Sequence, residues 1–383
     1  MAKIVMAIPI LEYIKTKMKI ENYKNIRSSI PLCFVNETEI LIAKNNRLFI
    51  YNIEQNVEEF IVELKSNFFL KNISKIKILF RLLRLGVRYA IPATKKDILL
   101  VFNYNFYEFD LQNKQIQKTF TLPRGNRPLN IVEVENIKGF DEGLYFGEYF
   151  ENMKRLPVNI YKRNSNRGWD IVFTFPADTI EHVHNIIPDS YNNCVWILVG
   201  DFDKAAGIWK ATDNFKNVIP VVMGQQQYRA CVAYPTENGL IYATDSQLEK
   251  NSIRILKEKN GIWESEYIKE INGPVIYGCK VKDDIFFSTS VEGDSLSKGP
   301  IKMFLDKTPG PGILSNKSVI IGGNLVDGFN VLYDNKKDRW PFILFQFGVM
   351  IFPTGNNNTN RLILYNIGLK NNDLSTTIFN IKK

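Results

Sequence analysis

The chain has few of the residues that build metal clusters and disulfide frameworks. Its 383 residues include four cysteines and two histidines. Cys33, Cys194, Cys231 and Cys279 lie far apart and form no CxxC pair, so they fit neither a cysteine-rich zinc module nor a disulfide-dense secreted domain. We expect the cysteines to be buried free thiols.

Long apolar runs and targeting signals are also lacking. The longest apolar runs, residues 4–11 and 349–352, fall far short of the roughly 20 residues that a membrane-spanning helix needs. Pro9 and Glu12 interrupt the N-terminal run, and no small-residue cleavage site follows it. We therefore expect a cytoplasmic protein without a transmembrane segment.

Several functional motifs are absent as well. The sequence contains no P-loop, no glycine fingerprint for dinucleotides and no GxSxG nucleophile elbow, which argues against nucleotide enzymes and serine hydrolases. The net charge of +9 makes a polyanionic partner plausible. The basic residues are scattered, however, and no helix-turn-helix, zinc-finger or RNP-like motif accompanies them, so we do not expect nucleic acid to be that partner.

What the sequence does contain is a repeated β pattern. Hydrophobic residues make up 45% of the chain, which is enough for a large core. Short apolar runs with period-2 alternation recur in pairs, and anchor residues in the second run of each pair return about every 52 residues between Tyr51 and Tyr365, close to the repeat of a four-stranded propeller blade. The seven pairs are residues 39–43 with 48–53, 98–102 with 106–111, 144–148 with 158–162, 195–200 with 207–211, 240–244 with 252–256, 285–289 with 300–305, and 349–353 with 361–366.

This pattern predicts an all-β fold, a β-propeller with seven four-stranded blades. Six blades are the alternative, because the first and last units are the least regular and ring closure often borrows a strand from the other terminus. We expect an N-terminal segment, residues 1–30, followed by a single propeller domain, residues 31–383. In each blade the two paired runs would be the middle strands.

One stretch has helical periodicity instead. Ile73, Ile76 and Phe80 are spaced as on one helix face, and basic residues such as Lys77 and Arg81 fall between them. We expect a short amphipathic helix, about residues 73–86, inserted between blades and packed on the flank of the propeller with its charges in solvent. A surface for anionic lipid and an arginine row leading into the channel are the alternatives.

The histidines are concentrated in one place. His182 and His184 stand near the start of the fourth inner strand, and strand alternation places residues i and i+2 on one face. Two imidazoles there could ligate a divalent metal, or one could act as a general base while the other binds substrate. A hydrogen-bonded structural pair is the alternative. The sequence indicates no other cofactor.

Carboxylates follow the second strands of three consecutive repeats. Glu148, Asp201 and Asp245 occupy similar positions there, and together with the histidines they could transfer protons or bind sugar hydroxyls. We predict that His182, His184, Glu148 and Asp201 are catalytic. The predicted substrate-binding residues, each near the same channel mouth, are Arg229, Tyr228, Arg88, Asn130, Gln227, Asp245 and Tyr277. Taken singly, each of them also fits a turn or loop contact.

Two segments carry a resemblance to known propellers. Residues 211–215, Ala-Thr-Asp-Asn-Phe, resemble a degenerate Asp-box of sialidase-like propellers. The block from about residue 127 to 290 is similar to glycosidase-like propellers associated with bacterial surface-polysaccharide genes. Sialidases use an arginine triad, a tyrosine–glutamate nucleophile pair and an aspartate acid, and the resemblance implies these roles for the residue types of Arg229, Tyr228, Glu148 and Asp201. The seven repeats of this chain differ from the six of sialidases. His182 and His184 are also similar in kind to the metal-binding histidines of some seven-bladed pectate-type lyases.

These observations favour a carbohydrate-active propeller. It would bind an anionic oligosaccharide or polysaccharide at the channel mouth, with Arg229 and Arg88 on the sugar carboxylate, and cleave a glycosidic bond as a hydrolase or a lyase. The alternative is a non-catalytic propeller that recognises a polysaccharide or a protein partner in surface-polysaccharide assembly. The fold class alone does not decide between the two.

Overall fold

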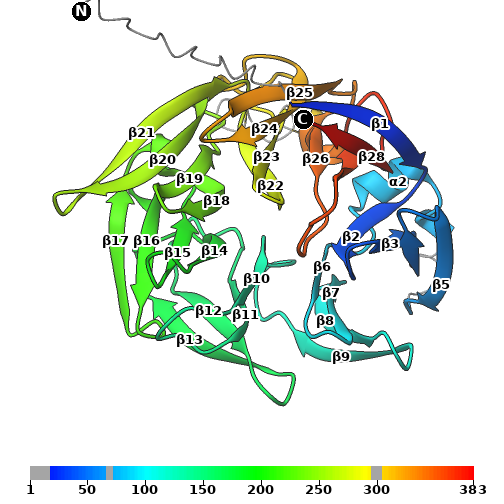
Figure 1. Cartoon of the computed structure of the whole chain (residues 1–383), viewed down its shortest axis with the longest axis horizontal. Coiled ribbons are helices and arrows are strands. Elements are labelled where there is room, and N and C mark those ends of the chain that lie inside the picture. The colour runs from blue at the N-terminus through cyan, green and yellow to red at the C-terminus, as the bar shows by residue number, and fades with distance from the viewer. Residues whose placement is uncertain (1–17, 66–71, 295–303) are drawn as a thin grey trace, which may run out of the picture.

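The structure is a ring of seven β-sheets. The computed structural model describes residues 18–65, 72–294 and 304–383. These residues form seven four-stranded antiparallel sheets around a central channel (Figure 1). The prediction of a seven-bladed all-β propeller is therefore confirmed, and the alternative of six blades is wrong.

In the first six blades the strands follow one another in sequence from the channel outward, and the innermost strands contact each other around the ring. Blades 1 to 3 consist of β2 (Ile30–Phe34), β3 (Glu39–Lys44), β4 (Arg47–Asn52), β5 (Val57–Glu63); β6 (Tyr89–Pro92), β7 (Asp97–Phe102), β8 (Asn105–Asp110), β9 (Gln115–Thr121); and β10 (Ile131–Val134), β11 (Gly143–Gly147), β12 (Val158–Arg163), β13 (Trp169–Phe175). Blades 4 to 6 consist of β14 (Val183–Asp189), β15 (Cys194–Val199), β16 (Gly207–Thr212), β17 (Asn217–Met223); β18 (Ala230–Thr236), β19 (Gly239–Thr244), β20 (Asn251–Lys259), β21 (Ile262–Ile271); and β22 (Val275–Val281), β23 (Asp284–Thr289), β24 (Lys317–Asn324), β25 (Gly328–Lys336).

Blade 7 joins the two ends of the chain. Its inner three strands are β26 (Val349–Ile351), β27 (Arg361–Ile367) and β28 (Ser375–Lys382), and its outermost strand is β1 (Lys19–Ile26), which pairs antiparallel with β28. Residues 19–26 fall within the segment 1–30 that the sequence analysis set apart from the propeller. In the structure they supply the strand that closes the ring.

The blades are held together by apolar faces. Every residue of β15 is buried, because both faces of this second strand are covered by neighbouring blades, whereas the outermost strand β5 has four of its seven residues exposed. Blade 7 packs on blade 1 in the same way: Ile26, Ile363 and Ile378 meet buried side chains of β3 and β4. Apolar packing between blades thus accompanies the β1–β28 pairing that closes the ring.

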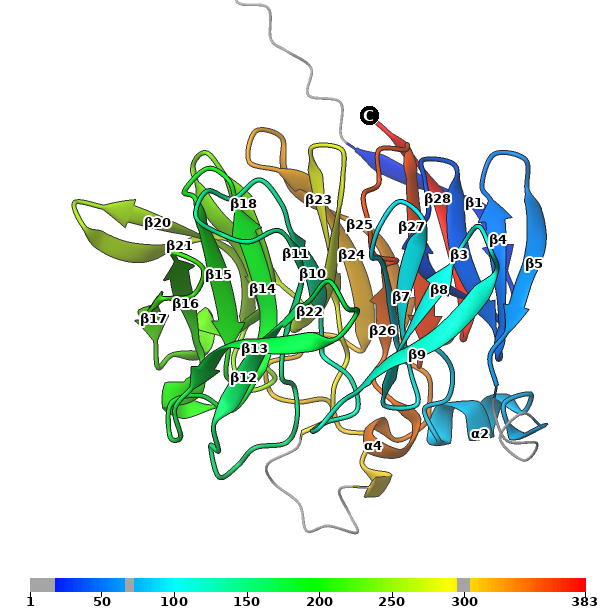
Figure 2. The same ribbon diagram turned by 90° about the horizontal axis from the view of Figure 1, so that it is seen from below.

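Two short helices lie on one face of the ring. Figure 2 shows α2 (Lys77–Leu82) and α4 (Phe342–Phe345) side by side at the lower face, which we call the helix face. Helix α2 is shorter than the predicted residues 73–86. The guanidinium of Arg81 is 4% exposed and pairs with Asp338 and Asp373, so this charge is buried rather than solvated as we had predicted.

Two of the seven predicted strand pairs are wrong. In blade 6 the third strand is β24, whereas we had placed it at residues 300–305. Residues 300–303 lie outside the described part of the chain, and Phe304 and Leu305 are helical. In blade 7 the predicted pair corresponds to β26 and β27, the first and second strands, because the fourth strand comes from the other end of the chain.

The remaining expectations concern the cysteines and the surface. All four cysteines are free; Cys33, Cys194 and Cys231 are buried and Cys279 is half-buried. In the described part of the chain, no helix is long and apolar enough to cross a membrane.

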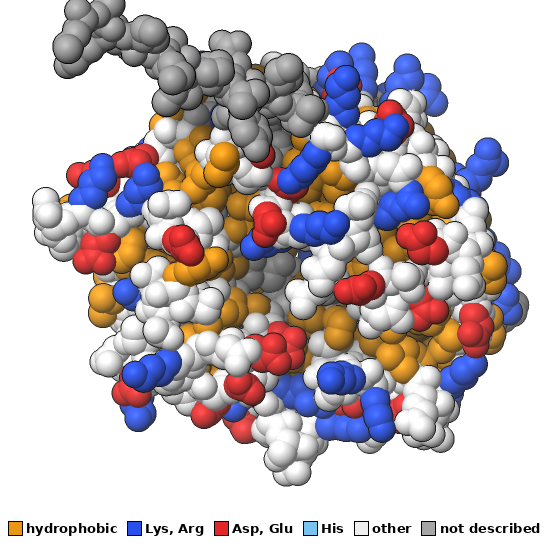
Figure 3. Space-filling model, in the orientation of Figure 1, with side chains coloured by type: hydrophobic (Ala, Val, Ile, Leu, Met, Phe, Trp, Pro, Cys, Tyr) orange, Lys and Arg blue, Asp and Glu red, His pale blue; other side chains and the backbone are white. Residues whose placement is uncertain are grey.

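The face in Figure 3 is hollowed at its centre, and Lys and Arg side chains are interspersed with Asp and Glu around the hollow. The net positive charge is therefore not gathered in one patch on this face.

The closing interface gives a test of the fold. Replacing Ile378 by Ala removes a fully buried side chain between blades 7 and 1, so we expect the free energy of unfolding to fall by about 2–5 kcal/mol in urea titrations. Val57→Ala is the matched control, since Val57 is 59% exposed on β5 and its truncation should change stability by no more than about 0.5 kcal/mol. Equal effects of the two substitutions would contradict this closure.

Candidate functional site

The candidate site lies in the channel at the helix face. A cavity of about 1190 Å³ occupies the channel and is lined by the inner strands and the loops that precede them. Because the strands of each blade alternate in direction, loops that enter an inner strand and loops that leave a second strand emerge on the same face. Helix α2 lies in one such entering loop, between β5 and β6, so these loops form the helix face.

His182 and His184 meet at the start of β14. Their Nε2 atoms are 3.1 Å apart. The pairing of β14 with β15 shifts register between Val183 and Asn185, which places a β-bulge at His184. The inner strands of blades 1, 5 and 6 shift register near the same point. The fold therefore supplies a recurrent bulge that re-aims side chains at the channel mouth, and His184 occupies it in blade 4.

Backbone carbonyl groups fix the orientation of both imidazoles. His182 Nδ1 lies 3.1 Å from the carbonyl oxygen of Phe150, and His184 Nδ1 lies 2.9 Å from that of Ala230. A carbonyl oxygen only accepts hydrogen bonds, so each Nδ1 carries the proton. In the neutral rings, each Nε2 therefore presents its lone pair to the other ring. Burial also lowers the pKa of His184, which favours its neutral form.

Asp201 completes this cluster from the loop after β15. One carboxylate oxygen lies 3.1 Å from His184 Nε2, and the other lies 3.4 Å from His182 Nε2. Burial alone would raise the pKa of Asp201, but the positive charge of Arg229 opposes this effect, and the pKa is held well below its usual range. Asp201 is therefore ionised, and its oxygens and the two Nε2 atoms face one another.

So many lone pairs in one place require a proton or a cation between them. The donor atoms of His182, His184 and Asp201 all lie within 4.8 Å of one another, and two imidazoles with one carboxylate form a ligand set that divalent transition metals accept. The Nδ1–carbonyl hydrogen bonds match the way that metal-binding histidines are usually oriented. The residues thus fit a divalent cation, and they equally fit a shared proton that one imidazole passes on as general acid or base.

Arg229 stands behind this cluster rather than in the cavity. Its guanidinium is 3.0 Å from Asp201 and 3.5 Å from Asp245, and its side chain is only 8% exposed. Asp245 also accepts a hydrogen bond from the thiol of Cys231, and burial raises the pKa of Asp245 against the opposing effect of Arg229. We had predicted that Arg229 holds a sugar carboxylate; its donors instead face two carboxylates of the protein.

Glu148 has a different environment from the one we predicted. It follows β11 as Asp201 follows β15, but its carboxylate pairs with Arg124 and accepts a hydrogen bond of 2.8 Å from the Asn159 backbone N–H. Glu148 is 2% exposed and does not line the cavity, so its geometry fits a structural role better than a catalytic one. The next residue, Tyr149, reaches the site instead, with its ring 4.6 Å from that of His182.

The other predicted residues divide into two groups. Asn130, Arg88 and Tyr277 line the cavity with His182 and Asp201, and the Asn130 amide donates to the His184 carbonyl oxygen. Gln227, Tyr228 and Asp245 do not line it. Gln227 bonds to Gln225, Tyr228 packs on a core cluster, and Asp245 lies behind Arg229.

Besides Tyr149, the predicted site residues omit two polar residues at the site. Arg127 lines the cavity from the loop before β10, and Gln226 donates to the Asp201 carbonyl oxygen at 2.9 Å. A signal for Arg127 exists in the sequence, because Arg88 and Arg229 also stand just before inner strands. No comparable signal separates Gln226 from Gln225 and Gln227.

Comparisons with known proteins support the fold alone. No protein-family model and no curated protein matches the chain. Among solved structures, an oligogalacturonate lyase from Vibrio parahaemolyticus matches with a TM-score of 0.53 and 10% identity, over 95% of this chain and 97% of that one. A chain in the crystal structure of a mitotic checkpoint complex matches with a TM-score of 0.51 and 10% identity, over 100% and 97%. These likenesses show a β-propeller fold and do not show a sialidase relationship.

The metal-binding capacity of the cluster can be measured directly. After treatment with chelator and dialysis, we expect the protein to bind Mn²⁺ or Zn²⁺ at one site per chain in isothermal titration calorimetry. His184→Ala removes one of three ligands and should weaken binding at least about tenfold. Asp213→Asn, at an exposed carboxylate on the β16–β17 turn, is the control and should leave binding unchanged. Equal affinities of parent and His184→Ala would show that the cluster holds a proton rather than a metal.

Proposed function

We propose that this propeller binds an anionic oligosaccharide at the helix-face mouth of its channel and cleaves a glycosidic bond, as a hydrolase or a lyase. The observation that carries the proposal is the convergence of His182, His184 and Asp201 at a cavity large enough for several sugar rings. A solved structure of similar fold is that of an oligogalacturonate lyase, so a ring of this shape is compatible with such a reaction.

Within the cluster, the side chains have different access to a ligand. His182 and Asp201 line the cavity, whereas His184 lies behind them and does not. His182 Nε2 is thus the nitrogen that can exchange a proton with a bound sugar. His184 would orient the imidazole of His182 and the carboxylate of Asp201 through its contacts with both.

A divalent cation held by His182, His184 and Asp201 would neutralise a sugar carboxylate and so make the adjacent C–H more acidic. His182 Nε2 cannot bind a cation and take up a proton at the same time, so only one of these roles applies in a given step. In a lyase a base, which is His182 Nε2 when no cation occupies it, takes the proton from the carbon next to the carboxylate. A C=C bond forms as the C–O bond to the leaving sugar breaks, and the leaving oxygen takes up a proton. In a hydrolase water supplies the hydroxyl group.

The experiment is a screen of acidic oligosaccharides read by mass spectrometry, with and without chelator. A lyase gives an unsaturated product and a hydrolase gives a product heavier by one water. Loss of turnover with chelator assigns the cluster to metal binding, and turnover that persists assigns it to proton transfer. Binding without any product would favour the alternative, a non-catalytic propeller for a polysaccharide or a protein partner.

Substitution of His182 tests the central residue of this proposal. We expect His182→Ala to lower turnover of an identified substrate by about 10²–10⁴-fold, because the imidazole facing the cavity is lost. The thermal unfolding transition should stay cooperative, since the neighbouring His184 and Asp201 remain paired. Unchanged turnover in His182→Ala would place the reaction elsewhere in the molecule.

Arg229 makes a separate prediction. Because Arg229 touches Asp201 and not the cavity, Arg229→Lys should lower kcat while leaving KM nearly unchanged. The ammonium keeps the charge but cannot span Asp201 and Asp245 with a planar fork. A rise in KM at constant kcat would instead indicate that Arg229 binds the substrate, as the sequence alone had suggested.

A further inference from the structure

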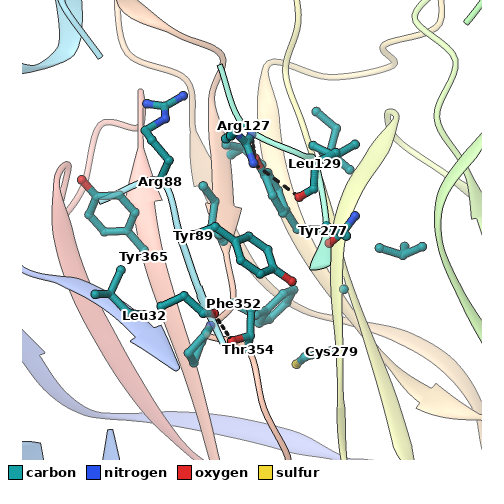
Figure 4. Close-up of a pocket in the computed structure, with 18 of the residues that line it drawn as sticks. Leu32, Arg88, Tyr89, Arg127, Leu129, Tyr277, Cys279, Phe352, Thr354 and Tyr365 are labelled. Atoms are coloured by element: carbon teal, nitrogen blue, oxygen red, sulfur yellow. Dashed lines mark hydrogen bonds between the residues drawn. The ribbon is translucent and has the colours of Figure 1, made fainter. Parts of the chain in front are cut away.

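Two arginines in the cavity have no acidic partner. Arg88 and Arg127 line the channel (Figure 4), in the same cavity that His182 and Asp201 line. Arg127 donates to the Tyr277 hydroxyl at 3.3 Å and to the Leu129 carbonyl oxygen at 3.4 Å, and Arg88 donates to the Arg84 carbonyl oxygen at 3.0 Å. Over residues 18–65, 72–294 and 304–383, no carboxylate lies within ion-pair distance of either guanidinium.

Neighbouring arginines show how unusual this is. Arg124 and Arg229, at the same channel mouth, are each paired with a carboxylate of the protein. For Arg88, burial and then repulsion from Arg127 lower the pKa, so keeping the Arg88 guanidinium charged beside Arg127 is costly. Both side chains are half-buried in the wall of the cavity, and the described part of the protein supplies no carboxylate to compensate their charge. An anionic group of a ligand would supply this compensation.

The surroundings of the two arginines suit a sugar. Figure 4 shows both guanidinium groups at the same end of the pocket, with the rings of Tyr89, Tyr277 and Tyr365 below them. The Tyr277 hydroxyl already contacts Arg127. Guanidinium forks bind planar carboxylates through paired hydrogen bonds, and tyrosine offers a flat apolar face with a polar tip.

Tyr149 connects these arginines to the histidine cluster. Its ring packs against the ring of His182, with centroids 4.6 Å apart. Arg127 is close enough to Tyr149 to act on its hydroxyl: burial raises the pKa of this hydroxyl, and the positive charge of Arg127 opposes that rise. Tyr149 also lines the cavity. One aromatic side chain therefore separates two places in the same cavity where an anionic group can be held.

We infer that Arg88 and Arg127 form a second carboxylate subsite, and that the ligand is an oligosaccharide with acidic groups on at least two of its sugars. This inference rests on the proposed function, since it takes the first acidic sugar to lie at the histidine cluster. The inferred subsite excludes glycans with a single terminal acid from the substrate class, because such a glycan would leave the two arginines without a negative charge. Sulfated sugars share the anionic chemistry and are distinguished by the test.

The test compares ligands of one and of several charges. Galacturonate, its trimer, the methyl-esterified trimer and a sulfated trisaccharide are titrated calorimetrically into the full chain carrying His182→Ala, which prevents cleavage during the measurement. We expect the galacturonate trimer to bind at least about tenfold more tightly than the monomer. Adding Arg127→Met should abolish that advantage, because a charged hydrogen bond contributes about tenfold or more in affinity. Arg127→Lys should recover part of it.

Arg47→Met is the matched control. Arg47 is 60% exposed on the outside of blade 1 and pairs with Glu63, so its loss changes the net charge equally without touching the channel. We expect this variant to keep the trimer advantage. Retention of the advantage in Arg127→Met, or equal binding of the methyl-esterified trimer, would overturn the subsite. Tighter binding of the sulfated trisaccharide would overturn its assignment to carboxylates.

The two proposals fail in different ways. If the parent protein cleaves the trimer while Arg127→Met binds it as tightly as the parent, the subsite is wrong and the proposed function stands. If binding depends on Arg127 but the parent never gives a product, the subsite stands and the enzymatic function is wrong.

Discussion

The pairing of β1 with β28 is the contact on which the rest of the structure depends. A four-stranded sheet cannot cover both of its own faces, so every blade needs a neighbour on each side. The ring meets this need only when residues 19–26 supply the fourth strand of blade 7 and Ile26, Ile363 and Ile378 pack on blade 1. The closed ring in turn brings loops from blades 2 to 6 to a single channel mouth.

At that mouth, the arrangement of charge determines what the site can do. Arg229 is shared by Asp201 and Asp245, and Arg124 is used by Glu148, so these groups are compensated within the protein. The Nε2 atoms of His182 and His184 and the oxygens of Asp201 have excess lone pairs, while Arg88 and Arg127 have excess positive charge. A cation or proton suits the first group and an anionic group suits the second, which is the arrangement that the proposed anionic glycan requires.

The sequence predicted the repeat well and the side-chain partners poorly. Short apolar runs located the middle strands of blades 1 to 5, because strands buried on both faces leave a clear apolar signal. It missed β24, because the long β23–β24 connection displaced that strand from its expected position. His182 and His184 stood out because the chain has no other histidine, and their contact with Asp201 lies within one blade. Arg124 with Glu148 and Arg127 with Tyr277 involve loop conformations and opposite sides of the ring, which spacing along the chain does not encode.

The most direct test of the account is a crystal structure of the protein, loaded with Mn²⁺ and briefly soaked with a galacturonate trimer. The account predicts the trimer inside the channel at the helix face, with one carboxylate beside His182 and Asp201 and a second on Arg88 and Arg127. A trimer bound in this pose would support both the proposed function and the second subsite. A trimer bound on the outer rim of the blades or at the opposite mouth, with these residues uncontacted, would contradict the account.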